Sequence, residues 1–134
     1  RSSDLGVRLG FVLAPQAIVT ALGERLGAWP LSAASIAIGS AAYADHDWIA
    51  ATRRRLPAEA AALDVLLVRR GHRPVGDCPL FRLIEVDDAQ ALFEQLAQRA
   101  ILTRPFADQP RWLRIGLPAD ADVSARLEAA LADG

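Results

Sequence analysis

Residues Ile101–Pro118 read ILTRPFADQPRWLRIGLP, and this stretch decides the fold that the sequence predicts. It contains two short apolar runs, each carrying one arginine (Arg104 and Arg114), and a turn bounded by proline separates them. A hairpin would bring both arginines close together. A guanidinium group binds carboxylate or phosphate through paired hydrogen bonds, each of about 1.5–3 kcal/mol. The stretch therefore allows a paired anion-binding site, but its spacing alone favours the simpler interpretation of two arginines at a sheet edge that extend into solvent.

Three strands and two helices are expected from residue 80 onward. The expected strands are the partly alternating apolar runs Leu80–Val86, Ile101–Pro105 and Trp112–Leu117. The expected helices are Ala89–Arg99, capped by Asp87 or Asp88, and Ser124–Ala132, opened by Asp122 or Ser124. We expect an α/β fold (an α+β layer), in which a small, largely antiparallel sheet carries helices mainly on one face.

The first half of the chain predicts one strand followed by long helices. Val7–Ala14 is rich in β-branched and aromatic residues and is interpreted as a buried strand. The helices expected after it are Gln16–Leu26, a helix capped by Ser32 that ends near Ala44, and a helix that Asp45 or Asp47 caps. Pro57 would either kink that last helix or begin a new one, and Gly71 suits the position just after its end.

Length, composition and charge exclude several classes of protein. With 134 residues, 52% of them hydrophobic, the chain is long enough to bury a core and is not disordered. No apolar run reaches membrane-spanning length and no signal segment opens the chain, so we expect a cytoplasmic protein without a membrane partner. The net charge of −1 argues against nucleic-acid binding by bulk electrostatics. The single cysteine, Cys78, excludes an internal disulfide.

The sequence offers little for metal binding or nucleophilic catalysis. His46 lies beside Asp45 and Asp47, but adjacent residues do not converge on one ion, and His72 has no second ligand at metal-binding spacing, so no metal site is predicted. Neither histidine has a recognisable nucleophile partner, and phosphate-loop and dinucleotide fingerprints are absent. All fifteen basic side chains are arginine, so chemistry that needs a lysine amine is closed to this chain.

Five short motifs carry a resemblance to a known family. They are GVRLGF at Gly6–Phe11, WPLS at Trp29–Ser32, PLFRLIEV at Pro79–Val86, ILTRPF at Ile101–Phe106 and WLRIGLP at Trp112–Pro118. In this order they resemble the C-terminal third of the pyridoxal-phosphate-dependent aminotransferases of fold type I. The combination of PLFRL with ILTRPF is most similar to the threonine-phosphate decarboxylases of cobalamin biosynthesis, which are relatives of histidinol-phosphate aminotransferase. The resemblance covers nearly the whole chain.

The resemblance implies roles for three arginines. Arg8, in the first motif, would hold the phosphate of the cofactor pyridoxal 5′-phosphate. Arg114 would bind the substrate α-carboxylate, and Arg104 would bind the second anion, a phosphate. The partner implied is a small phosphorylated amino acid, and the parent enzyme would be a homodimer.

The resemblance places no catalytic residue in this chain. The family's lysine, which forms a Schiff base with the cofactor, would lie about eight residues before Arg8 and is missing from the sequence. We therefore expect a piece of a longer protein that is inactive alone. Residues 1–28 would be the edge of the large cofactor-binding domain, residues 29–71 connecting helices and residues 72–134 the small C-terminal domain.

Three functions remain open at this point. The resemblance favours decarboxylation of L-threonine O-3-phosphate, and a transaminase like histidinol-phosphate aminotransferase is the first alternative. A non-catalytic α/β interaction domain is the second alternative, because the alanine-rich helix at residues 33–44 and Trp29 would suit a packing surface. The position of Arg104 and Arg114, in a common cleft or on opposite sides of the sheet, separates ligand binding from interaction.

Overall fold

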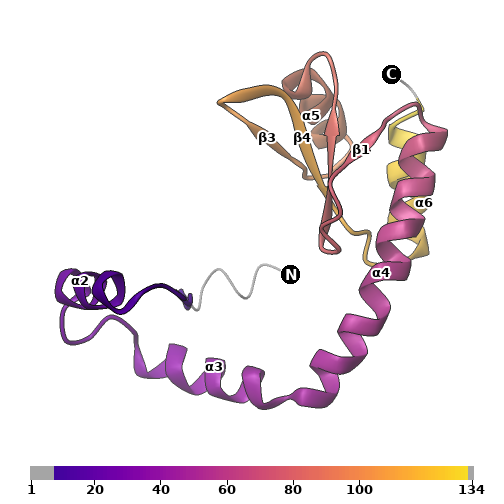
Figure 1. Cartoon of the computed structure of the whole chain (residues 1–134). Coiled ribbons are helices and arrows are strands. Elements are labelled where there is room, and N and C mark those ends of the chain that lie inside the picture. The colour runs from indigo at the N-terminus through magenta and orange to yellow at the C-terminus, as the bar shows by residue number, and fades with distance from the viewer. Residues whose placement is uncertain (1–7, 133–134) are drawn as a thin grey trace. The chain divides into compact units, whose positions relative to one another are not determined.

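The computed structural model describes residues 8–132, and the chain divides into two compact units, Arg1–Ile49 and Ala50–Gly134 (Figure 1). Helix α4, His46–Arg69, begins in the first unit and continues in the second. The resemblance implies a different division of the chain, into residues 1–28, 29–71 and 72–134 as parts of a larger enzyme. That division stays a prediction.

Capping residues set the helices of the first unit. Helix α2 spans Gln16–Leu26 and ends where Gly27 adopts a φ of 76°. Helix α3 spans Ala33–Ala44, and its N-cap Ser32 accepts a hydrogen bond of 3.0 Å from the backbone N–H of Ser35. The bounds of both helices confirm the sequence prediction, because a cap acts on backbone groups within four residues of itself.

The strand expected at Val7–Ala14 is wrong for the residues that the structure describes; Val7 itself lies outside them. Residues 8–14 form no strand, and the side chains of Phe11 and Leu13 are 67% and 101% exposed (Figure 1). A strand needs a neighbour to pair its backbone N–H and C=O groups. The described part of the first unit contains no strand, so this apolar sequence with strand propensity has no strand to pair with there.

The second unit is built on a four-stranded antiparallel sheet. The strands are β1 (Pro74–Val75), β2 (Phe81–Glu85), β3 (Arg104–Phe106) and β4 (Gln109–Gly116), in the order β1-β2-β4-β3. The three predicted runs therefore do form one sheet. The sequence prediction missed β1, which has only two residues, and placed the start of β3 three residues too early.

Two short helices complete the second unit, one after β2 and one after β4. Helix α5 (Ala89–Gln98) is capped by Asp88, as predicted. Helix α6 (Ala121–Ala130) is capped by Asp120, whose Oδ1 accepts a hydrogen bond of 2.8 Å from the backbone N–H of Val123. The prediction of Asp122 or Ser124 as the opening residue was wrong. Asp120, Asp122 and Ser124 all have side chains that can cap a helix, and the helix begins after the first of them.

Helix α4 runs through Pro57 without a break, so no new helix begins there. Its end follows the prediction for Gly71, which has a φ of 77°. The backbone N–H of His72 donates to the carbonyl of Leu67 at 2.9 Å, and that of Gly71 donates to Val68 at 3.0 Å. These two bonds form a Schellman motif, which satisfies carbonyls left open at the helix end.

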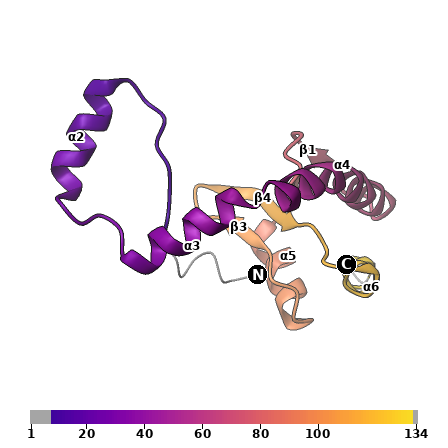
Figure 2. The ribbon, with the colours of Figure 1, turned by 90° about the horizontal axis from the view of Figure 1, so that it is seen from below.

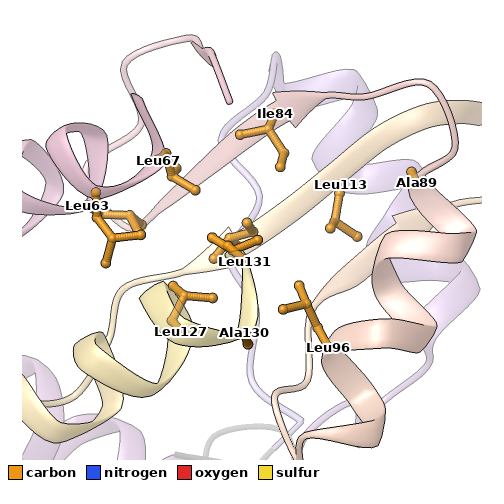
Figure 3. Packing of buried hydrophobic residues seen from close by; sticks show 11 residues of the cluster. Leu63, Leu67, Ile84, Ala89, Leu96, Leu113, Leu127, Ala130 and Leu131 are labelled. Atoms are coloured by element: carbon orange, nitrogen blue, oxygen red, sulfur yellow. The ribbon is translucent and has the colours of Figure 1, made fainter. Parts of the chain in front are cut away.

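The core lies between one face of the sheet and helices α4, α5 and α6 (Figure 3). Figure 2 shows α5 and α6 on the same side of strands β3 and β4. The largest fully buried side chains of the core are Leu63, Leu67, Ile84, Leu96 and Leu113. Because side chains alternate along a strand, the burial of Leu113 and Ile115 in this core places Arg114 on the opposite face of the sheet. We call this the helix-free face, because the core helices α4, α5 and α6 pack on the other one.

Candidate anion-binding site

Arg104 and Arg114 are direct neighbours across the strand pair β3–β4. The register places Arg114 opposite Arg104 on one side and opposite Leu83 of β2 on the other. Residues that oppose each other in antiparallel strands project from the same face of the sheet. The two arginines that the sequence singled out are therefore brought together on the helix-free face.

Aromatic rings accompany both guanidinium groups. The Cζ atom of Arg114 lies 5.1 Å from the centroid of the Phe81 ring, and that of Arg104 lies 5.4 Å from the centroid of the Phe106 ring. The ring of Phe106 also meets Trp112 edge to face, with centroids 6.3 Å apart. Sequence reasoning missed these rings. For Phe106 and Trp112 the available signal was their spacing of two residues from Arg104 and Arg114 along β3 and β4. Phe81 lies on a different strand from Arg114, so only the pairing of β2 with β4 reveals its contact.

Neither Arg104 nor Arg114 pairs with a carboxylate among residues 8–132. Other arginines of the sheet differ in this respect. Arg111, on the same strand as Arg114, lies 3.1 Å from Glu85 and 3.3 Å from Asp87. Like charges that oppose each other across a strand pair destabilise a sheet. A bound anion would relieve this repulsion.

The two arginines line one open groove of about 760 Å³. Most of the remaining lining is apolar. It comes from β2, β3, β4, α5 and the residues directly before β2 and β3: Leu80, Phe81, Phe93, Leu102, Thr103, Pro105 and Gly116. Two cationic forks within apolar walls suit a small molecule that carries two anionic groups on a short carbon skeleton.

A third arginine, Arg82, has a structural role behind the site. It is only 8% exposed, and its Nη2 donates to Asp64 Oδ2 of α4 at 2.8 Å while its Nη1 donates to the carbonyl of Cys78. The hydrogen bond from Arg82 is the main reason that the pKa of Asp64 lies below its usual range. This pair fixes the start of β2 against α4. Sequence reasoning did not find it, because the partners are eighteen residues apart.

Arg8 belongs to the first unit, whereas Arg104 and Arg114 belong to the second. Its side chain is exposed, and its backbone adopts a φ of 55°, a conformation that residues other than glycine rarely take. Within the described residues no carboxylate pairs with Arg8. The side chain is therefore available to an anion such as a phosphate.

Two kinds of feature are absent from residues 8–132. No cluster of three or more histidine, cysteine, aspartate or glutamate side chains gathers there around a point that could hold a metal ion. Within the same residues no helix combines the length and the apolar character needed to cross a bilayer.

Comparison with known proteins gives a consistent set of relatives. The family model for aminotransferase class I and II matches residues 5–131. Threonine-phosphate decarboxylase of Pseudomonas aeruginosa is 41% identical over 126 residues, and that of a Sinorhizobium species is 39% identical over 130 residues. Histidinol-phosphate aminotransferase 2 of Rhizobium meliloti is 34% identical over 134 residues. These matches cover 94–95% of this chain and 38% of each relative, so the chain spans well under half the length of the curated proteins.

Proposed function

The chain belongs to the aminotransferase class I and II family, and from this premise we propose that it supplies the substrate-binding part of a pyridoxal-phosphate enzyme. The family is pyridoxal-phosphate dependent. The whole protein would decarboxylate L-threonine O-3-phosphate, the activity that the names of two relatives indicate. It would act as a homodimer, as the resemblance implies.

One observation carries the proposal: Arg104 and Arg114 face each other across adjacent strands, and no described carboxylate pairs with either. Threonine phosphate carries a carboxylate and a phosphate on a short skeleton, so one ligand can engage both guanidinium groups. Arg114, partly buried on an inner strand, would take the α-carboxylate. Arg104, exposed on an edge strand, would take the larger and more strongly hydrated phosphate.

The residues present fit one end of the cofactor. Arg8, exposed and without a described carboxylate partner, would hold the cofactor phosphate. The chain has no lysine, so the amine that holds the other end must come from another part of the polypeptide. Bound pyridoxal phosphate supplies an electron sink for the bond that breaks at the substrate α-carbon.

The contribution of this chain to the reaction would be orientation. The α-carboxylate leaves readily only when its bond stands perpendicular to the plane of the electron sink. A bidentate contact from Arg114 would fix the direction of that bond, and Arg104 would hold the far end of the substrate. The expected benefit comes from positioning the carboxylate and not from neutralising its charge.

A transaminase is the second candidate, and the 34% identity to histidinol-phosphate aminotransferase 2 favours it. The same two arginines could hold the anions of its substrates. A non-catalytic interaction domain has less support, because Arg104 and Arg114 share one groove and do not lie on opposite sides of the sheet.

A titration of the 134-residue chain followed by ¹H–¹⁵N NMR tests the two-anion site. We expect O-phospho-L-threonine to bind more tightly than L-threonine or inorganic phosphate, each of which engages fewer guanidinium groups. Arg114→Ala should weaken this binding. The matched control is Arg111→Ala on the same strand, whose arginine already pairs with Glu85 and Asp87. Equal binding of all three ligands, or equal effects of the two variants, would contradict the proposal.

The choice between decarboxylase and transaminase needs the whole protein. Supplied with pyridoxal phosphate and O-phospho-L-threonine, a decarboxylase releases carbon dioxide without an amino acceptor, whereas a transaminase produces a keto acid and depends on that acceptor. Release of carbon dioxide at a rate independent of added 2-oxoglutarate is the outcome we expect.

A further inference from the structure

The two site arginines are each laid against a phenylalanine on the helix-free face of the sheet. The distances from guanidinium carbon to ring centroid are 5.1 Å for Arg114 and Phe81 and 5.4 Å for Arg104 and Phe106. Both lie within the range of about 6 Å over which a cation is attracted to the face of an aromatic ring. The arrangement occurs twice, once across the strand pair β2–β4 and once within strand β3.

The strand register explains the contact between Phe81 and Arg114. Phe81 pairs with Gly116, and Arg114 precedes Gly116 by two residues, so Phe81 and Arg114 are diagonal neighbours on one face. A diagonal separation is within reach of aromatic and long side chains. Gly116 has no side chain, and a Cβ placed there would meet no atom within 4 Å. The space beside the ring and the guanidinium is therefore open.

The contact between Phe106 and Arg104 has a different origin. Phe106 lies two residues after Arg104 on β3, next to the point where the register with β4 shifts. Its ring is held in turn by Trp112, which it meets at an interplanar angle of 89°. The guanidinium of Arg104 thus lies over a ring that a second aromatic side chain contacts.

The backbone that carries Phe81 is held in place by contacts on the other face of the sheet. Its neighbour Arg82 points to the opposite face, where hydrogen bonds to Asp64 and to the carbonyl of Cys78 hold the start of β2. A ring on an anchored backbone offers a constant surface to the guanidinium that lies on it.

An arginine without a carboxylate partner loses considerable rotamer freedom when it binds a ligand. A ring against one face of the guanidinium restricts that freedom beforehand, and it leaves the N–H groups in the guanidinium plane free to donate. This arrangement suits bidentate binding of carboxylate or phosphate.

We propose that Phe81 and Phe106 are positioning residues for the anion-binding site. Phe81 orients the guanidinium of Arg114, and Phe106, supported by Trp112, orients that of Arg104. The inference rests on the proposed function, because its ligand is the phosphorylated amino acid. It adds the residues that prepare the two arginines for that ligand.

The test uses the whole chain and three variants of phenylalanine. Phe81→Leu keeps an apolar side chain but removes the ring, and Phe81→Tyr keeps the ring. Phe93→Leu is the matched control, because Phe93 lines the same groove and no arginine stacks on it among the contacts of the described residues. For each variant we would measure the NMR shifts of the Arg114 side chain, the dissociation constant for O-phospho-L-threonine and the melting temperature.

The ring should shift the Arg114 side-chain protons upfield in the free chain, and Phe81→Leu should abolish this shift while Phe81→Tyr retains it. We expect Phe81→Leu to weaken binding of O-phospho-L-threonine by about 3- to 10-fold, the range for a partly exposed cation–ring contact. Phe81→Tyr should bind within about twofold of the unchanged chain, since a tyrosine ring also attracts cations. Phe106→Leu gives a second, independent measurement on Arg104 should Phe81→Leu fail to fold.

Several outcomes would overturn the inference. Unchanged binding by Phe81→Leu, or an equal loss in Phe93→Leu, would mean that the ring only fills space. Loss of binding in Arg114→Ala together with normal binding in Phe81→Leu would refute the positioning role alone and leave the proposed function standing. If the unchanged chain does not bind O-phospho-L-threonine, both the positioning role and the proposed function are refuted. The NMR shifts would then report only a structural contact.

Discussion

Arg82 and Arg114 lie on adjacent strands, and the alternation of side chains gives them different tasks. The side chain of Arg82 points to the core face of the sheet, where it donates hydrogen bonds to Asp64 and to a backbone carbonyl. Arg114 faces away from the helices and meets Phe81. A buried guanidinium must have its hydrogen bonds satisfied by the protein, whereas an exposed one on a concave apolar surface can bind a ligand. The alternation of side chains along a strand thus decides whether an arginine lies on the core face or on the face that a ligand could reach.

Arg114→Ala should damage turnover of the whole enzyme far more than it damages the fold. Loss of a bidentate carboxylate contact removes about 2–4 kcal/mol of productive binding, or roughly 30- to 1000-fold in kcat/KM. Arg114→Lys should recover little, since an ammonium group does not reproduce the planar fork. The measurement is kcat/KM on a phosphorylated amino acid, with the melting temperature alongside.

Arg104→Ala provides the comparison for this prediction. It should lower kcat/KM for phosphorylated substrates and spare amino acids without the second anion. Near-normal efficiency of Arg114→Ala, or loss of activity only through unfolding, would mean that the arginine pair is an incidental surface feature.

The ion pair between Asp64 and Arg82 predicts a dependence of stability on pH. The pKa of Asp64 is lowered in the folded chain, mainly by the hydrogen bond from Arg82. Its contribution to stability is therefore complete above the pKa of the unfolded state, about 4, and is lost as the pH falls through the lower folded pKa. At pH 7, Asp64→Asn should reduce the free energy of unfolding by about 1–2 kcal/mol, less than a fully buried charged hydrogen bond contributes, because the Asp64 side chain is 37% exposed to solvent. This difference should shrink below about pH 4.

Thermal melts between pH 2 and pH 7 would measure this effect. Asp87→Asn is the matched control, because Asp87 is fully exposed in its contact with Arg111 and should contribute little. A difference between Asp64→Asn and the unchanged chain that stays constant down to pH 2 would contradict the assignment.

Two helices end with the same Schellman geometry but with different residues at the left-handed position. Gly71 follows α4 with a φ of 77°, and Ala100 follows α5 with a φ of 57°. After α5 the backbone N–H of Ile101 donates to the carbonyl of Leu96 at 2.9 Å, as His72 does to Leu67 after α4. The left-handed conformation suits glycine and is strained for alanine.

Opposite changes at these two ends should therefore have opposite effects. Gly71→Ala should lower the free energy of unfolding by about 1 kcal/mol, through the backbone alone. A Cβ at residue 71 would meet no atom within 4 Å, so no clash adds to that cost. Ala100→Gly should raise the free energy by about 0.5–1 kcal/mol, since the relief of strain exceeds the added entropy of the unfolded chain. Chemical denaturation measures both changes in the free energy of unfolding. Changes of the same sign would show that packing, and not backbone conformation, determines the effect of these substitutions.

For the molecule as a whole, the absence of lysine limits what it does with its expected cofactor. Mixed with pyridoxal phosphate, the chain should give no saturable adduct that borohydride fixes, apart from slow reaction at the N-terminal amine. Arg8 can contribute only charged hydrogen bonds to the phosphate. Absorbance near 420 nm and mass spectrometry after reduction would test this. A stoichiometric adduct at any side chain would refute it.

The sequence by itself determined the features that depend on neighbouring residues. The bounds of α2 and α3 follow from Gly27 and Ser32, which act on backbone groups within one turn. The alternation around Arg114 indicated that its side chain would face away from the core. The five short motifs, three of which contain Arg8, Arg104 and Arg114, indicated the family, which the match over residues 5–131 confirms.

Only the tertiary structure decided how distant segments meet. The register that sets Arg104 opposite Arg114, the ring of Phe81 beneath the guanidinium and the partner of Arg82 all depend on pairing between strands and helices far apart in the chain. Residues 8–14 form no strand because no other strand lies beside them in the described part of the first unit. Strand propensity stabilises a strand only when a neighbouring strand pairs with it. Local chemistry fixes where an element begins and ends, whereas contacts between elements fix which side chains form a site.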